Sequence, residues 1–198
     1  MTIHAHPDDE SSKGAGSVAL YSDAGVTATL VCCTGGEEGD ILNPAMDRPE
    51  IKQNIAKVRQ EELATAAHII GYKRVHYLGY RDSGMPDTEA NKNPDCFANA
   101  PLDEAVGRLV KIIREEKPHV IVTYPDDQQG YQHPDHLKVF DISLPAWEAA
   151  GDPLKFPEFG DPWTPLKLYY TTWSRARSEA LHDMFIKLKI ESPFNDAW

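Results

Sequence analysis

Residues 4–10 read His-Ala-His-Pro-Asp-Asp-Glu and residues 133–136 read His-Pro-Asp-His, so imidazoles and carboxylates gather in two short segments. Zn²⁺ binds such nitrogen and oxygen atoms, and a catalytic zinc site needs three protein ligands and one open position for water. We expect His6, Asp9 and His136 to be the three ligands. Asp8, beside a ligand but not needed as one, is then free to act on the water, which outlines a metal-assisted hydrolase.

Outward from these segments, short apolar runs alternate with helical patterns, which favours βαβ units. We therefore predict an α/β fold with a Rossmann-like, mostly parallel sheet flanked by helices. In open α/β sheets ligands bind outside the carboxyl ends of the strands, so the active site is expected there and the two segments should meet. Strands are expected at residues 3–5, 26–33, 75–78, 120–124 and 166–172, and helices at 11–23 (capped by Ser11 or Ser12), 51–70, 102–116, 134–150 and 175–189.

Length and charge restrict the class of protein. The 198 residues suit a single domain, 1–198, with a substantial core. The net charge of −11 argues against a nucleic-acid surface. No apolar run approaches the roughly 20 residues that span a bilayer, and the amino terminus lacks a signal sequence.

The cysteines do not suggest a disulfide framework. Cys32 and Cys33 lie in an apolar run that is typical of a buried strand, and Cys96 stands alone. Free cysteines of this kind behave as small hydrophobes, which suits a reducing, cytoplasmic location.

The two motifs, in this order, resemble the zinc-dependent N-deacetylase superfamily. Below that level the likeness is greatest to its mycothiol S-conjugate amidases, and it extends over nearly the whole chain. It implies the same fold and a zinc-dependent amidase that releases a mercapturic acid and glucosaminyl-inositol in detoxification; the alternative is an N-deacetylase of acetylglucosaminyl-inositol or another N-acetyl sugar. Because the relatives are longer, we expect a further C-terminal portion. Besides the motifs, the likeness rests on residues 11–14, 35–37, 41–47 and 130–132.

The catalytic roles follow partly from residue chemistry and partly from the resemblance. Asp8 is expected to be the general base. The resemblance implies His133 as a catalytic group and Tyr131 as a donor to the developing oxyanion. Asp135 could hydrogen-bond a ring nitrogen of His133 and raise its basicity. Alternatives are a helix-start carboxylate for Asp135, a packed loop aromatic for Tyr131, and a helix cap with a satisfied histidine for His6 and Asp9.

Substrate contacts are expected by position. The resemblance implies that Arg59 and Asp82 contact sugar hydroxyls, that Glu37 lies near the inositol, and that Lys13 contacts the acyl group. A solvated surface arginine, an Asx turn and an exposed lysine are the alternative interpretations of Arg59, Asp82 and Lys13.

The expected partner is a small molecule, with no nucleic acid and no membrane; the oligomeric state is not predicted. Fe²⁺ is an alternative to Zn²⁺ in a His₂Asp site. A non-catalytic metal- or sugar-binding protein is the rival class, and Asp8 argues against it because such a protein needs no carboxylate beside its ligands. His4 is expected to be a buried, satisfied histidine.

Overall fold

The computed structural model describes residues 1–128, 131–172 and 174–193, so Gly130 of the second motif region lies outside the described residues. Five strands form one sheet in the order β3-β2-β1-β4-β5, and every pairing is parallel. This order confirms the predicted Rossmann-like α/β fold. The strands are β1 (Thr2–His4), β2 (Ala28–Thr34), β3 (Tyr72–Tyr80), β4 (Val120–Thr123) and β5 (Lys167–Tyr170).

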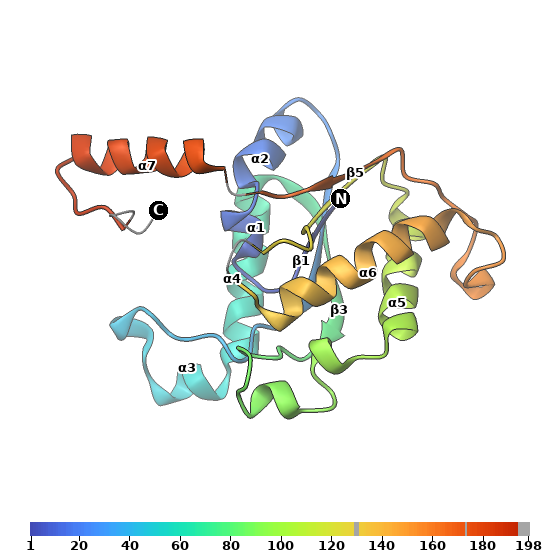
Figure 1. Cartoon of the computed structure of the whole chain (residues 1–198), viewed down its shortest axis with the longest axis horizontal. Helices are drawn as coiled ribbons and strands as arrows, with labels where there is room; N and C mark the ends of the chain where they lie inside the picture. Colours follow the sequence, from blue (N-terminus) through green and yellow to red (C-terminus); the bar gives the residue numbers. More distant parts are fainter. Residues whose placement is uncertain (129–130, 173, 194–198) are drawn as a thin grey trace.

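Helices cover both faces of the sheet (Figure 1). On one side lie α2 (Ala15–Asp23) and α4 (Ile55–Ile70), and on the other α5 (Leu102–Glu116) and α6 (Pro134–Gly151). Strand alternation in β2 explains the division, because successive side chains point to opposite faces. Val31 and Cys33 belong to the core under α5 and α6, whereas Leu30 and Cys32 belong to the core under α4.

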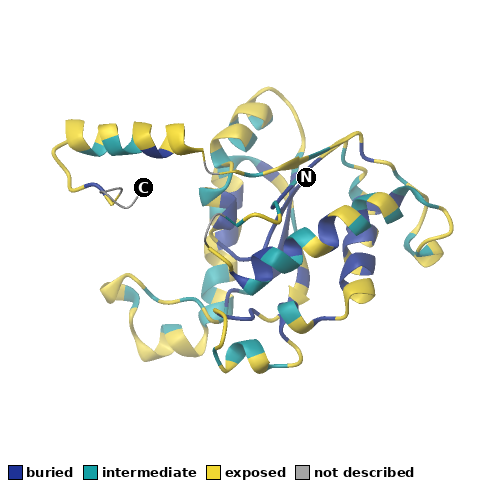
Figure 2. Ribbon diagram, viewed as in Figure 1, coloured by how far each residue is buried: buried dark blue, intermediate teal, exposed yellow. Residues whose placement is uncertain are grey.

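The helix α5 has the bounds that the sequence predicts. Its apolar side chains recur at helical spacing, and Leu109 and Ile113 are fully buried against the sheet. Lys117 ends the helix in the left-handed region, just before Pro118. Figure 2 shows the resulting buried stripe along α5 and α6 and the exposed outer surfaces of both helices.

The predicted helix 11–23 is wrong in detail, because the chain leaves the helix at Gly14, whose φ is +109°. A four-residue helix, α1 (Asp9–Ser12), precedes the break and α2 follows it. Neither Ser11 nor Ser12 caps a helix. The residue before α1 is Asp8, and its side chain makes no capping hydrogen bond.

The predicted helix 51–70 is also two helices, α3 (Pro49–Gln53) and α4, separated at Asn54. The side-chain amide of Asn54 donates to the carbonyl of Glu50, which ends α3. The strand β3 is longer than predicted because its pairing with β2 extends from Tyr72 to Tyr80 through polar, edge-exposed positions. The remaining elements are α7 (Arg175–Lys187) and the 3₁₀ turns η1 (Pro44–Met46), η2 (Ala90–Lys92), η3 (Phe97–Asn99) and η4 (Pro157–Phe159).

Among the described residues, no helix combines the length and the apolar character needed to cross a membrane. All three cysteines are free and buried, as expected, and Cys32 and Cys33 lie in the predicted strand. Helix α7 extends away from the sheet (Figure 1).

Candidate active site

The first motif forms a tight turn at the carboxyl end of β1. The backbone N–H of His6 donates to Oδ2 of Asp9 at 3.0 Å, and His6 Nδ1 lies 3.5 Å from the same oxygen. Asp8 adopts a φ of 107°, a conformation that costs a non-glycine residue about 1–3 kcal/mol. The buried carboxylate of Glu10 accepts the N–H of Asp8 at 2.8 Å and so holds this turn. As a result, Asp9 is buried while Asp8 stays exposed.

The second motif begins α6 and brings its histidines to the same place. His133 precedes the first turn of α6, and His136 lies within that turn. Nε2 of His136 is 3.5 Å from Oδ2 of Asp9. One ligand atom from each of His6, Asp9 and His136 can be chosen so that all lie within 4.8 Å of one another. The three predicted metal ligands therefore come together, although about 130 residues separate the two segments.

These three side chains fit a tetrahedral metal ion. Metal–ligand distances of about 2.0–2.2 Å place neighbouring ligand atoms about 3.4 Å apart in a zinc site. The two distances to Asp9 Oδ2, both 3.5 Å, match that spacing. In addition, Nε2 of His6, on the far side of the ring from Asp9, lies 3.0 Å from Oδ2 of Asp135. A carboxylate on the second ring nitrogen is the usual support of a metal-bound histidine.

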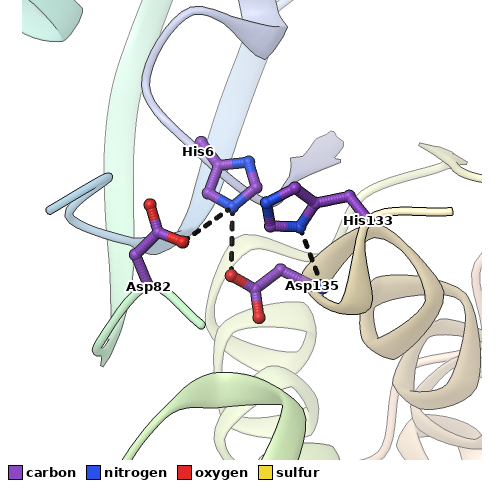
Figure 3. Close-up of side chains that lie close together, drawn as sticks. All are labelled: His6, Asp82, His133 and Asp135. Atoms are coloured by element: carbon purple, nitrogen blue, oxygen red, sulfur yellow. Dashed lines mark hydrogen bonds and ion pairs between the residues drawn. The ribbon is translucent and has the colours of Figure 1, made fainter. Parts of the chain in front are cut away.

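A second group of possible ligands shares His6 and adds Asp82, His133 and Asp135 (Figure 3). The carboxylates in this group already accept hydrogen bonds from the protein. Asp82 accepts the N–H of Gly84 at 2.8 Å, and Asp135 accepts both the N–H and the hydroxyl of Ser83. We favour His6, Asp9 and His136 as the metal ligands, because their spacing of 3.5 Å around Asp9 Oδ2 matches a tetrahedral site and Asp135 then supports His6 from its other ring nitrogen.

The predicted contact between Asp135 and His133 takes a different form. The backbone N–H of Asp135, not its carboxylate, meets Nδ1 of His133 at 3.2 Å, and the carboxylate contacts His6 and Ser83 instead. The proposal that the Asp135 carboxylate raises the basicity of His133 by a direct hydrogen bond is therefore wrong. Since Nδ1 is the acceptor, a neutral His133 carries its proton on Nε2. Burial, followed by the nearby charge of His6, lowers the pKa of His133 to about 4.

Arg59 is not a solvated surface arginine. Only 15% of its side chain is exposed, and its guanidinium contacts Asp8 Oδ2 at 2.7 Å. It also donates to the carbonyl oxygens of Gly36 and Pro7, at 2.8 and 2.5 Å. Partial desolvation and the charge of Asp9 raise the pKa of Asp8, and Arg59 opposes them. Arg59 thus ties the glycine-containing loop after β2 to the turn that carries Asp8.

Lys13 and Glu37 have partners that the sequence did not predict. The ammonium of Lys13 forms an ion pair with Oδ1 of Asp9, the carboxylate oxygen that faces away from the histidines. The carboxylate of Glu37 accepts the backbone N–H of Asp82 at 2.9 Å and does not line the cavity described below; its neighbour Glu38 does. Glu37 therefore supports the loop that carries Asp82.

The Asx-turn interpretation of Asp82 is confirmed, and its contact with sugar hydroxyls stays a prediction. Its Oδ1 accepts the N–H of Gly84, which forms the Asx turn, and lies 3.6 Å from His6 Nε2. The predicted oxyanion donor, Tyr131, has 54% exposure, so it is not a packed core aromatic. Its ring lies 5.6 Å from that of His136, and its hydroxyl contacts only the weak acceptor Met85 Sδ, at 3.9 Å, among the hydrogen bonds of the described residues.

Most of these side chains line one cavity of about 370 Å³. Sequence reasoning missed several functional neighbours, including Ser83, which holds Asp135, and Met85 and Glu38 in the cavity wall. The loop 80–100 is rich in Gly, Pro, Asn and Asp, and its Asx-turn pattern was the only signal for Ser83 and Met85. The wall includes all three favoured metal ligands together with Asp8, Lys13, Arg59, Asp82, Tyr131 and His133.

The sequences of two curated proteins align with nearly the whole of this chain. The mycothiol S-conjugate amidase of Streptomyces coelicolor is 45% identical over 99% of the chain. The 1D-myo-inositol 2-acetamido-2-deoxy-alpha-D-glucopyranoside deacetylase of Streptomyces avermitilis is 40% identical over 98% of it. The chain spans 68% and 66% of the length of these two relatives, about two thirds.

Solved structures agree on the fold. The N,N'-diacetylchitobiose deacetylase of Pyrococcus horikoshii superposes with a TM-score of 0.69 over 95% of this chain and 66% of that one, at 22% identity. The 4-carboxy-2-hydroxymuconate hydratase GalB of Pseudomonas putida, at 20% identity, superposes with a TM-score of 0.57 over 81% of this chain and 61% of that one. Because the second protein is named for a different reaction, these likenesses establish the architecture and not the chemistry.

Membership rests on the sequence. The family model described as "PIG-L: GlcNAc-PI de-N-acetylase" matches residues 1–147, which include both motifs. With the metal ligands converging at the predicted edge of the sheet, the match assigns the chain: it belongs to the GlcNAc-PI de-N-acetylase (PIG-L) family.

Proposed function

We propose that this protein is a zinc-dependent amide hydrolase that cleaves mycothiol S-conjugates to a mercapturic acid and glucosaminyl-inositol. The observation that carries the proposal is the convergence of His6, Asp9 and His136 in one cavity with Asp8, which has a side chain 72% exposed and is not one of the three ligands. A binding protein needs the ligands but has no need of that fourth group.

The residues fit Zn²⁺, with Fe²⁺ as the alternative, and such an ion supplies a polarised carbonyl and an acidified water when bound. Asp8 accepts the proton of the attacking water, for which its exposed carboxylate is suitably placed in the cavity wall. Arg59 holds one oxygen of that carboxylate. The contact fixes the direction of the carboxylate without burying it, which favours a short and well-oriented proton transfer.

Two further side chains serve the carbonyl and the leaving group. The Tyr131 hydroxyl, which contacts the weak acceptor Met85 Sδ at 3.9 Å, donates to the oxygen on which negative charge develops. His133 carries its proton on Nε2, away from the backbone N–H that occupies Nδ1, and donates a hydrogen bond from Nε2 to the nitrogen of the leaving group. The proton that this nitrogen gains is the one that Asp8 took from the water. Asp135 acts through His6, whose ring it orients.

The amidase is preferred over the deacetylase because identity to the amidase is 45% over 99% of the chain, against 40% over 98% for the deacetylase of Streptomyces avermitilis. The deacetylase remains the second candidate, since several curated deacetylases reach 40–44% identity over shorter stretches. For either activity we propose Arg59, Asp82 and Lys13 as residues close to the substrate and Glu37 as the support of Asp82. We also propose a role in detoxification and a cytoplasmic location. The buried free thiols favour a reducing compartment such as the cytoplasm.

The test is hydrolysis of two substrates, a mycothiol bimane conjugate and acetylglucosaminyl-inositol, by zinc-reconstituted protein. Asp8→Ala is the informative variant, and Asp23→Ala, an exposed aspartate at the far end of α2, is the matched control. We expect preference for the conjugate and loss of about 10²–10⁴ in turnover in Asp8→Ala alone.

Preference for the acetyl sugar would transfer the assignment to the deacetylase. Stoichiometric zinc binding without hydrolysis of either substrate would contradict both activities. Full activity of Asp8→Ala would remove the proposed base.

A further inference from the structure

Beneath the favoured metal ligands lies a buried polar pair that the proposed reaction does not use. His4 ends β1 and Tyr124 directly follows β4, the neighbouring strand in the sheet. Each residue is 1% exposed. His4 Nδ1 lies 3.0 Å from the Tyr124 hydroxyl, and the backbone N–H of Ala5 donates to the same oxygen at 3.4 Å.

Tyr124 lies beside His136 and beside Lys13, the partner of Asp9. Its ring meets that of His136 edge-on, with centroids 4.9 Å apart. That same His136 has its Nε2 3.5 Å from Oδ2 of Asp9, and burial first, and then the Asp9 carboxylate, raise the pKa of the Tyr124 phenol. The ammonium of Lys13, paired with Asp9, stands 5.5 Å from the centroid of the same ring. One side chain thus adjoins two metal ligands and the cation that neutralises one of them.

The hydrogen bonds allow only one sensible direction for the phenol proton. If Tyr124 donated to His4, the imidazole would carry its proton on Nε2, and Nε2 has no hydrogen-bond partner in its buried position. A buried, unpaired N–H donor is the rarer and costlier defect, whereas an unpaired acceptor is more easily tolerated. His4 therefore donates from Nδ1 to the phenol oxygen, which also accepts the N–H of Ala5. The phenol proton is then free to point at the Asp9 carboxylate.

We infer that Tyr124 is a positioning residue for Asp9 and His136, and that His4 acts through it by fixing the direction of its hydroxyl. Metal-bound carboxylates are themselves hydrogen-bonded in well-ordered sites, and the loss of such a partner typically reduces metal affinity or activity about 10–100-fold. This inference rests on the proposed metal site, but it concerns residues outside the three ligands and the cavity wall.

The experiment measures metal binding directly. Zinc affinity is determined by competition with a chelator, and the visible absorption of the Co²⁺-substituted protein reports ligand geometry. Tyr124→Phe keeps the ring against His136 and removes only the hydroxyl. Tyr72→Phe is the matched control, because Tyr72 is also a buried sheet tyrosine, with its hydroxyl 2.8 Å from Thr2 Oγ1 and on the face opposite to α5 and α6.

We expect Tyr124→Phe to bind zinc about 10–100-fold more weakly and to change the Co²⁺ spectrum, while Tyr72→Phe does neither. His4→Leu should reproduce the effect of Tyr124→Phe, and the double variant should add little, since both act through one hydrogen bond. His4→Asn should restore affinity, because its amide nitrogen can donate from the position of Nδ1.

Unchanged zinc affinity and an unchanged Co²⁺ spectrum in Tyr124→Phe would overturn the inference, as would an equal loss in Tyr72→Phe. Failure of His4→Asn to exceed His4→Leu would overturn the role of His4. If the unsubstituted chain itself binds no metal, the proposed function fails, which is a separate outcome.

Discussion

Two clusters of histidine and carboxylate lie at opposite ends of the sheet, and they differ in charge balance. At the amino end, the single carboxylate of Glu116 meets Arg74 at 2.6 Å, His76 at 2.9 Å and Thr29 at 3.0 Å. At the carboxyl end, three carboxylates surround one histidine, His6, and Lys13 neutralises only one of them. The second cluster has an excess of negative charge.

The difference shows which cluster is complete without a ligand. The hydrogen bonds of Arg74, His76 and Thr29 satisfy Glu116, so that cluster needs nothing further. At the carboxyl end, burial lowers the pKa of His6, but the hydrogen bonds that its ring donates to the neighbouring carboxylates outweigh burial and raise the pKa above its ordinary value. An excess of negative charge around a histidine is the electrostatic character expected of a metal site.

Of the substitutions that test this difference between the two clusters, Asp9→Asn should have the largest effect. It removes the ligand oxygen charge that His6 and His136 share and leaves Lys13 without its partner. Zinc affinity should fall by more than the about 100-fold upper range of supporting residues, and hydrolysis should disappear. Chelator competition and single-substrate assays measure both quantities. Retained stoichiometric zinc would indicate that the group of Asp82, His133 and Asp135 holds the metal instead.

Tyr131→Phe separates chemistry from metal binding within the same cluster. Turnover should fall about 10²–10³-fold because an oxyanion donor is lost, while zinc affinity stays unchanged. Steady-state kinetics at saturating zinc provide the measurement. A change confined to KM would show that Tyr131 binds the ground state only.

The zinc affinity of the site should depend on pH. The cluster around Glu116, at the amino end of the sheet, should not respond to zinc. His6 must lose its proton to bind a metal and its pKa is raised, so apparent zinc affinity should increase as pH rises, by up to about tenfold per unit for one released proton. Calorimetry in two buffers of different ionisation enthalpy counts the proton. Zinc binding with no proton release would contradict the protonated state of His6.

Glu116→Gln tests the amino-end cluster and should affect stability alone, by about 1–3 kcal/mol, since Thr29, Arg74 and His76 lose a charged acceptor. Although burial raises the pKa of Glu116, its hydrogen-bond donors lower it below the ordinary value of 4.5. The group therefore stabilises the fold above pH 4.5, and this contribution is lost as pH falls through the lowered folded pKa. Denaturant unfolding of the variant should show a weaker acid dependence and unchanged zinc affinity. A loss of zinc affinity would show that the two ends are coupled.

Sequence reasoning succeeded where one periodicity or one motif was sufficient. The amphipathic pattern fixed α5 to its end residues, and apolar runs located all five strands. It failed where backbone conformation was decided by contacts. Gly14 and Asn54 interrupt helices that continuous apolar spacing favoured. The contact of Asp9 with His136 joins two segments that are far apart in the chain, and no local pattern contains it.

Side-chain partners show the same limit. The placement of Arg59, Lys13 and Glu37 near a substrate stays a prediction, and the sequence did not indicate their contacts with Asp8, Asp9 and the backbone of Asp82. Asp135 lies two residues from His133 in the chain and yet places its carboxylate on His6. Proximity in sequence suggested the wrong histidine, because the first turn of α6 directs that side chain inward.

The sequence by itself determined the parallel α/β fold and the family, and it predicted which residues would come together as metal ligands, because hydrophobic periodicity and ligand chemistry are local properties. Only the tertiary structure decided which carboxylate oxygen faces which histidine, which charges remain unbalanced, and that His4 and Tyr124 lie beneath Asp9 and His136. Those arrangements depend on strands β1 and β4 being neighbours in the sheet, which brings together residues 120 positions apart.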